Sequence, residues 1–264
     1  MAHASPLITV MVGAARKAAR SLRRDFGEVE QLQVSRKGAA DFVSAADVRA
    51  EEILVEELRK ARPKYGFLLE EGGEIEGTDN SNRWIVDPLD GTTNFLHGLP
   101  HFAISIALER DREPYAGVIF NPITDELYWG EKGQGAFMNE RRLRVSARSD
   151  LSESIFATGI PFLGRGEHDQ FLGELRRIMA HTAGVRRWGA AALDLAFVAA
   201  GRYDGFWERG LAPWDVAAGM VLVREAGGVV ETIEGGGKAH LDGSIAASNG
   251  AVHTAFAGLV KDRD

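Results

Sequence analysis

The sequence predicts an α/β protein in which sheets are layered between helices. Two observations support this fold class: the first half reads as two helices followed by a series of short strands, and the second half alternates strands with helices. The 264 residues allow one large domain or two fused halves, and contents of 45% apolar and 26% charged residues are typical of a globular protein. We expect a single domain over residues 1–264, with a soft boundary near residue 146 between an α+β half (1–146) and an α/β half (147–264).

Two helices are expected to open the chain. Apolar residues recur on one helical face over residues 7–24, and Ser5-Pro6 is typical of an N-cap followed by proline in the first turn. The second helix covers residues 45–61, with Ser44 as its cap and Pro63 beyond its end. A short strand is expected at residues 67–69. Later strands are expected at residues 102–108, 115–120, 126–129 and 135–138, and the Gly, Pro and Asn residues between most of them indicate an antiparallel meander.

The second half is expected to alternate between the two kinds of element. Strands are predicted at residues 155–158, 203–207, 229–233 and 245–247, and helices at residues 168–181, 190–200, 214–226 and 251–260. Both halves supply acidic residues at element ends, so we expect a functional site between them.

Composition excludes several classes of site. The chain contains no cysteine, so disulfides, thiolate catalysis and thiolate metal sites are ruled out, and a cytoplasmic location fits this composition. No segment approaches the roughly 20 apolar residues needed to span a bilayer. The net charge of -7 argues against a general nucleic-acid binder, and short basic spots such as Arg186-Arg187 are expected to be solvated surface.

The stretch WIVDPLDGTTNF, residues 84–95, carries the strongest chemical signal. A short apolar run delivers Asp87 and Asp90 into a turn marked by Pro88 and Gly91. Two carboxylates so close together at the end of a buried strand repel each other, and each requires a partner. A divalent cation resolves both problems, and an all-oxygen ligand set favours Mg²⁺ or Mn²⁺ over zinc. The stretch therefore predicts a metal-assisted site for a phosphate-bearing substrate.

Four further acidic residues have positions that suit the same site. Glu70 follows a short apolar strand, and Glu208 ends the strand YDGFWE. Asp47 and Asp215 lie in the first turns of helices, where complementing the helix dipole would by itself explain a carboxylate. Either glutamate could equally be an ordinary residue of the exposed surface. Together with the aspartate turn these acids converge, because a cluster of two or three cations requires about this many oxygen ligands.

Two signatures in order identify a family resemblance. DPLDGTTNF, followed about 120 residues later by WDVAAG and then EAGG, resembles the signatures of the inositol monophosphatase family, part of a superfamily of Mg²⁺-dependent, lithium-sensitive phosphatases. DFVSAAD resembles the acidic segment before the family's second helix, and LLEEGG stands in the place of its GEE segment. The segment from Arg186 to Asp215 looks like that of the bacterial inositol monophosphatases.

The resemblance implies the layered αβαβα sandwich of that family, a homodimer, and a small phosphorylated polyol as substrate. The implied reaction is hydrolysis of inositol 1-phosphate to inositol and phosphate by a metal-activated water, with two to three Mg²⁺ ions and Mn²⁺ as the alternative ion. The metal ligands would be four carboxylates and one backbone carbonyl: Glu70, Asp87, Asp90, Asp215 and Leu89.

The resemblance also assigns catalytic and substrate roles. Glu70 and Thr92 would orient the attacking water, and Asp47 would lie near a third, weaker cation through water. The phosphate would be bound by the backbone N–H groups of Gly91, Thr92 and Thr93. The other residues implied to bind the substrate, chiefly its polyol, are Gly189, Ala190, Ala191, Glu208 and Asp215. His97 and His101, just beyond the aspartate turn, are expected to have structural or rim roles.

Three departures from the family pattern leave the substrate open. Leu69 replaces the glycine before the glutamate pair, Ala190 stands where the family often has Ser or Thr, and the bulky Trp188 could restrict the neighbouring loop. The same chemistry on fructose 1,6-bisphosphate, 3'-phosphoadenosine nucleotides or histidinol phosphate is an alternative, although the Glu208 carboxylate favours a neutral polyol over a second phosphate. A regulatory protein that binds RNA or a transcription complex, with secondary phosphatase activity, is the alternative of another class.

Overall fold

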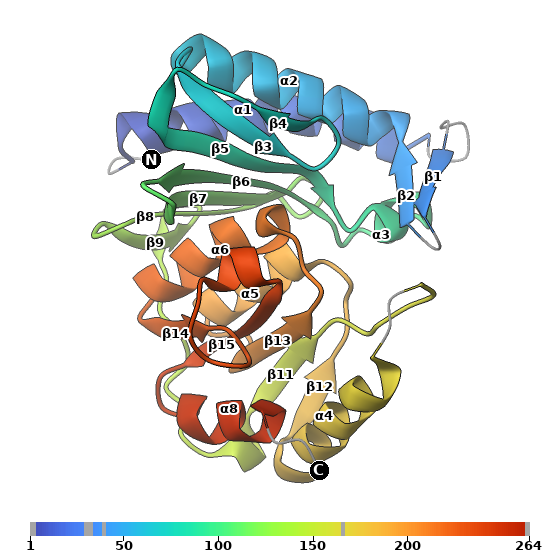
Figure 1. The fold of residues 1–264 in the computed structure, drawn as a ribbon, viewed down its shortest axis with the longest axis vertical. Coiled ribbons are helices and arrows are strands. Elements are labelled where there is room, and N and C mark those ends of the chain that lie inside the picture. The colour runs from blue at the N-terminus through green and yellow to red at the C-terminus, as the bar shows by residue number, and fades with distance from the viewer. Residues whose placement is uncertain (1–3, 29–33, 39–40, 165–166, 262–264) are drawn as a thin grey trace.

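The computed structural model describes residues 4–28, 34–38, 41–164 and 167–261, which form five layers (Figure 1). Helices α1 (Pro6–Phe26) and α2 (Ala45–Ala61) cover one face of an eight-stranded sheet. Helices α5 (Ala191–Ala199) and α6 (Pro213–Glu225) separate it from a five-stranded sheet. Helices α4 (His168–His181) and α8 (His253–Lys261) cover the far face of that second sheet. The predicted αβαβα sandwich is confirmed.

The eight-stranded sheet contains the expected meander. Its order is β10-β9-β8-β7-β6-β5-β3-β4, and among the described residues only the β3–β5 pair is parallel. The strands are β3 (Tyr65–Leu69), β4 (Gly73–Ile75), β5 (Asp79–Asp90), β6 (Ala103–Arg110), β7 (Glu113–Asn121), β8 (Glu126–Glu131), β9 (Gly135–Met138) and β10 (Arg141–Arg142).

The five-stranded sheet has the order β12-β11-β13-β15-β14, with β11 parallel to both of its neighbours. Its strands are β11 (Ile155–Thr158), β12 (Gly184–Arg186), β13 (Gly205–Arg209), β14 (Gly228–Glu231) and β15 (Ser244–Asn249). The short elements are a hairpin, two small helices and one 3-10 turn: β1 (Val34–Gly38), β2 (Asp41–Ser44), α3 (Thr92–Leu96), α7 (Ala239–Asp242) and η2 (Leu151–Glu153).

Several short elements differ from the sequence prediction. The strand expected at residues 203–207 begins at Gly205 and continues to Arg209, because Tyr203 still belongs to the turn after α5. The β1–β2 hairpin and strands β4 and β12 were not predicted. Strands β4 and β12 are only three residues long, too short for an alternating apolar pattern to reveal them.

The helix starts follow the local chemistry of their sequences. Ser5 Oγ accepts a hydrogen bond from the Ile8 N–H at 3.2 Å, and Pro6 occupies the first turn of α1. Ser44 and Asp47 form a capping box at the start of α2. Within the described residues, no helix combines the length and the apolar character needed to cross a membrane.

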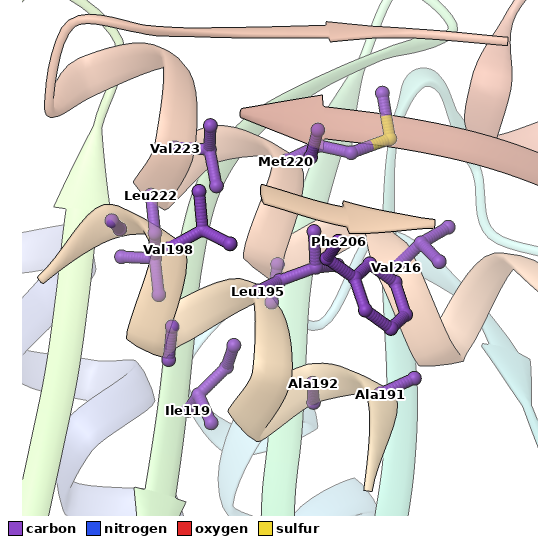
Figure 2. Packing of buried hydrophobic residues seen from close by; sticks show 14 of the residues in the cluster. Ile119, Ala191, Ala192, Leu195, Val198, Phe206, Val216, Met220, Leu222 and Val223 are labelled. Atoms are coloured by element: carbon purple, nitrogen blue, oxygen red, sulfur yellow. The ribbon is translucent and has the colours of Figure 1, made fainter. Parts of the chain in front are cut away.

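The middle layer is apolar on all sides because both of its faces are covered by sheets (Figure 2). Small residues let backbones approach: a Cβ on Gly117 of β7 would lie 2.5 Å from the Ala218 carbonyl of α6, and one on Gly219 would lie 2.5 Å from the Leu195 Cβ of α5. Figure 2 shows side chains of α5 and α6 meeting Ile119 from β7 and Phe206 from β13. This packing fixes α6, whose first turn carries Asp215, against the larger sheet.

Candidate active site

Glu70 and Asp87 lie side by side because β3 and β5 run parallel and end together. Leu69 is in register with Val86, and the Glu70 N–H donates to the Val86 carbonyl at 3.2 Å. The two carboxyls are close enough that the Glu70 side chain raises the pKa of Asp87. The carboxyl ends of these two strands therefore bring together acids 17 positions apart in the sequence.

A bulge between Asp87 and Asp90 ends the regular pairing of β5 with β6. The Leu89 N–H donates to Asp87 Oδ1 at 2.8 Å, which folds the intervening residues into a tight turn. A bulge redirects side chains at the end of a strand, so Asp90 continues the acidic surface that Asp87 begins. Asp90 Oδ2 accepts a hydrogen bond from the Ala192 N–H at 2.8 Å, which ties the turn to the first turn of α5.

Both aspartates of the turn carry unfavourable charge. Asp87 is 2% exposed and Asp90 is 9% exposed. Burial raises the pKa of Asp87 well above its usual value, and the charges of Glu70, Asp90 and Asp215 raise it further. Burial likewise raises the pKa of Asp90, followed by the charge of Asp215, and the hydrogen bond from Ala192 offsets only part of this. The site therefore concentrates negative charge, and within the described part of the chain the donors recorded to these two carboxylates are the backbone N–H groups of Leu89 and Ala192.

Asp215 enters the same site from the other half of the chain. It lies in the first turn of α6, where Asp215 Oδ2 accepts from the Ala212 N–H at 2.7 Å. The helix start is anchored to the larger sheet because Ser105 Oγ of β6 donates to the Trp214 carbonyl at 3.1 Å. The prediction that both halves contribute acids to one site agrees with this arrangement.

Thr92 connects the turn to Asp47. Its hydroxyl lies 3.0 Å from Asp47 Oδ1 and 3.0 Å from the Leu89 carbonyl, which are both acceptors. Asp47 is fully buried, and burial raises its pKa despite hydrogen bonds from Ser44 and Thr92. Gly91 precedes α3 with φ 93°, and a Cβ there would lie 3.1 Å from the His101 carbonyl, so the tight approach of the chain requires glycine. The structure thus places Asp47 behind Thr92, where it fixes the hydroxyl.

A cavity of about 290 Å³ opens beside these acids. Its far wall contains Glu208, whose carboxylate lies against Gly159: a Cβ on Gly159 would be 1.9 Å from Glu208 Oε1. All eight residues predicted to bind substrate line this one cavity: Gly91, Thr92, Thr93, Gly189, Ala190, Ala191, Glu208 and Asp215. The other predicted site residues are not among those that line the cavity: Glu70, Asp87, Leu89 and Asp47.

Sequence reasoning missed three polar residues of this region. Asn94 is buried, and its Nδ2 donates to the carbonyls of His101 and Trp188, both at 2.8 Å. Arg187 is exposed, as expected of a surface arginine, but it also lines the cavity. Asp194 is buried in α5, and its Oδ1 has no hydrogen-bond partner among the described residues. An aspartate inside the apolar helix AALDLAFVA was a usable signal for a buried charge.

His101 and Trp188 pack against each other next to the site. His101 is buried, and its ring packs against Trp188 with centroids 5.0 Å apart. Burial lowers the pKa of His101 to about 4, which keeps the ring neutral and agrees with a structural role. Trp188 contacts His101 and does not line the cavity, and the expectation that it restricts the neighbouring loop stays a prediction.

The donor set suits a hard divalent cation. Glu70, Asp87, Asp90 and Asp215 offer only oxygen, and a cation would reverse the repulsion that raises the pKa of both aspartates of the turn. In the part of the chain that the structure describes, no three His, Asp or Glu side chains already stand close enough to hold a metal ion. Because the pKa of Asp87 is raised, binding of a cation there would compete with binding of a proton.

Comparisons with known proteins agree with this geometry. The inositol-1-monophosphatase of Rhizobium meliloti (strain 1021) is 64% identical over 245 residues, which are 93% of this chain and 92% of that protein. The Nus factor SuhB of Escherichia coli (strain K12) is 43% identical over 257 residues, 97% of this chain and 96% of that protein.

Solved structures show the same fold. The extragenic suppressor protein suhB from Bartonella henselae superposes with a TM-score of 0.95 at 56% identity, covering 98% of this chain and 100% of that chain. Inositol monophosphatase from Anabaena (Nostoc) sp. PCC 7120 gives a TM-score of 0.83 at 37% identity, covering 96% and 94%. A model of the inositol monophosphatase family matches residues 3–264, which confirms the resemblance seen in the two signatures. The chain belongs to the inositol monophosphatase family.

Proposed function

We propose that this protein is an Mg²⁺-dependent phosphomonoesterase that hydrolyses inositol 1-phosphate to inositol and phosphate. The observation that carries the proposal is the pair Asp87 and Asp90, whose pKa values are raised by burial and by neighbouring carboxylates at the edge of a cavity. Such a pair is unfavourable in the protein alone and favourable once a cation is bound. The Rhizobium relative named inositol-1-monophosphatase supports the substrate.

The family resemblance assigns the metal-binding residues. Glu70, Asp87, Asp90 and the Leu89 carbonyl would hold one cation, and Asp87, Asp90 and Asp215 a second, with Mn²⁺ as the alternative ion. When bound, the cations would neutralise the phosphate dianion, lower the pKa of water and stabilise the leaving alkoxide. A third, weaker cation would lie near Asp47 through water.

The chain's own groups orient the reacting molecules. The Thr92 hydroxyl has a single hydrogen, with Asp47 Oδ1 and the Leu89 carbonyl both in reach as its acceptor, so its lone pairs are left to accept a hydrogen bond from the attacking water. Glu70 would accept the proton of that water, and the backbone from Gly91 to Thr93 would meet the phosphate oxygens. No covalent phosphoenzyme is required.

The opposite wall of the cavity would bind the polyol. Glu208 can accept hydrogen bonds from hydroxyl groups, and its charge disfavours a second phosphate beside it. Gly189, Ala190 and Ala191 line the cavity with small residues, which leaves room for a ring-shaped alcohol. These contacts are the reason that a neutral polyol phosphate is preferred over a bisphosphate.

Other family properties belong to the same proposal. We infer a homodimer in the cytoplasm, a single domain with a soft internal boundary near residue 146, and inhibition by Li⁺ at the second cation position. Light scattering tests the dimer. Inhibition by millimolar Li⁺ that weakens as Mg²⁺ rises tests the lithium site, and indifference to Li⁺ counts against it.

The direct experiment measures Mg²⁺-dependent phosphate release from inositol 1-phosphate beside fructose 1,6-bisphosphate and a 3'-phosphoadenosine nucleotide at equal concentrations. Clear preference for inositol 1-phosphate supports both the chemistry and the pocket. Preference for another ester keeps the metal assignment and overturns the substrate. Release from none of the three contradicts the proposal.

Arg187 supports a second candidate, in which the ester carries a further anionic group. Its Nη1 would lie 2.6 Å from a Cβ on Gly189, so the guanidinium is placed over the substrate loop. Arginine binds phosphates in a forked geometry, which suits a bisphosphate or a phosphonucleotide. Arg187→Gln should then raise KM for such esters and leave inositol 1-phosphate unaffected, with the exposed neighbour Arg186→Gln as the matched control.

The relatives named Nus factor SuhB support a candidate of another class, a regulatory protein with secondary phosphatase activity. A gel shift with structured RNA over a salt series tests it. Binding that weakens steeply with salt supports contacts to phosphates, and absence of binding at low salt removes this candidate.

A further inference from the structure

A second cavity lies beside the catalytic one. It measures about 180 Å³ and is enclosed by the carboxyl ends of the parallel strands β11 and β13, the loop after β11, and α4. In open sheets, the crevice outside the carboxyl ends of parallel strands is the usual place for ligands. The cavity therefore occupies a favourable position in the fold.

The two cavities share walls. Gly159, Phe162 and Glu208 line both of them. The contact between Gly159 and the Glu208 carboxylate forms this common boundary, since a Cβ on Gly159 would overlap both carboxylate oxygens. A molecule whose hydroxyl groups reach Glu208 from the catalytic side is thus placed next to the second cavity.

The walls of the second cavity are mainly apolar. Ile160, Pro161, Phe162 and Phe171 line it together with the indole of Trp207. The buried charge at its base is already neutralised within the protein: Glu174 accepts from Arg209 Nε at 2.7 Å and from Trp207 Nε1 at 3.2 Å. These walls favour an uncharged, flat, apolar group.

The volume suits one aromatic ring. A cavity of about 150 Å³ lined by aliphatic and aromatic side chains is known to hold benzene. Ile160 is 45% exposed and Phe162 is 37% exposed, so the apolar surface of this loop is incompletely covered by the protein itself. An aromatic ring that entered the cavity would bury part of this exposed apolar surface.

We propose that this second cavity is a subsite for an aromatic ring carried by the alcohol part of a phosphate monoester bound in the catalytic cavity. The inference rests on the proposed function, because the phosphate must lie at the aspartate turn for the ring to reach the subsite. It extends the substrate class from small polyol phosphates to esters whose alcohol carries an aryl group on a short chain.

The test uses pairs of phosphate monoesters that differ only by a phenyl group. Methyl, ethyl and propyl phosphate are compared with benzyl, 2-phenylethyl and 3-phenylpropyl phosphate, using the full-length protein with Mg²⁺. The leaving alkoxides within each pair are similar, so the ratio of kcat/KM reports binding of the ring in the transition state. We expect the phenyl group to raise kcat/KM about tenfold or more at one chain length, as burial of one ring predicts.

Variants of the loop locate the effect. Ile160→Ala and Phe162→Ala each remove part of the apolar wall and should reduce the phenyl preference several-fold. Leu163→Ala is the matched control, because Leu163 lies in the same loop, is 70% exposed and does not line the cavity. It should leave the ratio unchanged.

The outcomes separate this inference from the proposed function. Turnover of the alkyl esters and of inositol 1-phosphate without a phenyl preference at any chain length overturns the subsite alone. A phenyl preference that survives both Ile160→Ala and Phe162→Ala places the ring elsewhere and also overturns it. Failure to hydrolyse any ester overturns the proposed function, and the subsite with it.

Discussion

Buried carboxylates lie near both ends of strand β5, but the protein shifts their pKa values in opposite directions. Near its start, Arg83 is in register with Glu109 of β6, and Arg83 Nε lies 2.7 Å from Glu109 Oε1. His240 Nε2 lies 3.2 Å from Glu109 Oε2. Burial, the largest influence, raises the pKa of Glu109, but the hydrogen bonds from His240 and Arg83 outweigh it, so the pKa is lowered. The protein itself supplies the counter-charge at this end.

At the other end of β5, Asp87 and Asp90 meet further acids, and their pKa values are raised. Asp87 follows Arg83 by four residues on β5, so at a strand rise of about 3.3 Å per residue the two regions are about 13 Å apart. The same sheet thus supplies Glu109 with the Arg83 guanidinium and a hydrogen bond from His240 at one end, whereas no ion pair to Asp87 or Asp90 is found among the described residues at the other. This difference agrees with a structural role for Glu109 and with our proposal that Asp87 and Asp90 bind a cation.

The sharpest test changes one carboxyl to an amide at each end. Asp90→Asn should lower Mg²⁺-dependent phosphate release by more than about a hundredfold. This exceeds the loss of about 10- to 100-fold that is typical when a residue that only hydrogen-bonds to a metal ligand is changed. Glu109→Gln is the matched change at the structural end and should leave turnover near that of the unmodified protein. Phosphate release in saturating Mg²⁺ measures both. Wild-type turnover in Asp90→Asn would show that the end of β5 that carries Asp87 and Asp90 is not the metal site.

Binding of Mg²⁺ should stabilise the fold through the acidic end alone. At a concentration 100 times Kd, a ligand that binds only the folded state adds about 2.7 kcal/mol to the free energy of unfolding. Urea unfolding with and without Mg²⁺ should show this increase in the unmodified protein and in Glu109→Gln.

The increase should disappear in Asp90→Asn, which should itself be more stable than the unmodified protein without Mg²⁺ because a repulsive charge is removed. Protons compete for the same carboxyls, so the Mg²⁺ effect should weaken as pH falls. An equal Mg²⁺ effect in Asp90→Asn would contradict the comparison.

Substitution of Thr92 tests whether the end of β5 that carries Asp87 and Asp90 also orients the attacking water. Thr92→Val removes the hydroxyl that bonds Asp47 and the Leu89 carbonyl, and we expect kcat to fall about 10- to 100-fold, as for an outer partner in a metal site. Thr92→Ser keeps the hydroxyl and should restore most of the activity. If Thr92→Ser is as impaired as Thr92→Val, the methyl group rather than the hydroxyl matters, and Thr92 does not orient water.

The acidic end was predictable because its chemistry is local in sequence. Asp87 and Asp90 follow an apolar run and are separated by the turn residue Pro88, so their position at a strand end could be read directly. Glu70 and Asp215 were found because a strand end and a helix start each leave a side chain at an edge. The family resemblance then combined them into one site; the family is confirmed, and the roles of these residues stay a prediction.

Other parts of the site depend on contacts that the sequence does not encode locally. Asn94 bonds the carbonyl of Trp188, 94 positions away, and such a pairing exists only after the two halves pack. The second cavity is formed by α4, the loop after β11 and β13, which come together only in the folded sheet. Strands of three residues, such as β12, escaped prediction for the same reason, since their partners define them.

Removing the Glu109 carboxylate should lower the stability of the fold and leave activity unchanged. Glu109→Gln leaves Arg83 and the buried His240 without their carboxylate, and we expect a loss of about 2 kcal/mol of unfolding free energy, discounted because Arg83 is partly exposed. Glu113→Gln, which breaks the exposed ion pair with Lys238, is the control and should cost less than about 0.5 kcal/mol. Equal losses in the two variants would mean that burial of Glu109 does not matter.

Two histidines extend the comparison to pH. His240 faces Glu109, whereas His101 lies near the acidic end and burial alone lowers its pKa to about 4. In the unfolded chain a histidine has a pKa of about 6.5, so below that pH the unfolded state gains a proton that folded His101 resists. Stability should therefore fall as pH drops from about 6.5 toward 4, and His101→Gln should recover about 1 kcal/mol at pH 5 after discounting for partial solvation. Urea unfolding at pH 7 and pH 5 measures this, with the exposed His97→Gln as the control; equal recovery in both variants would show that the burial of His101 is not the cause.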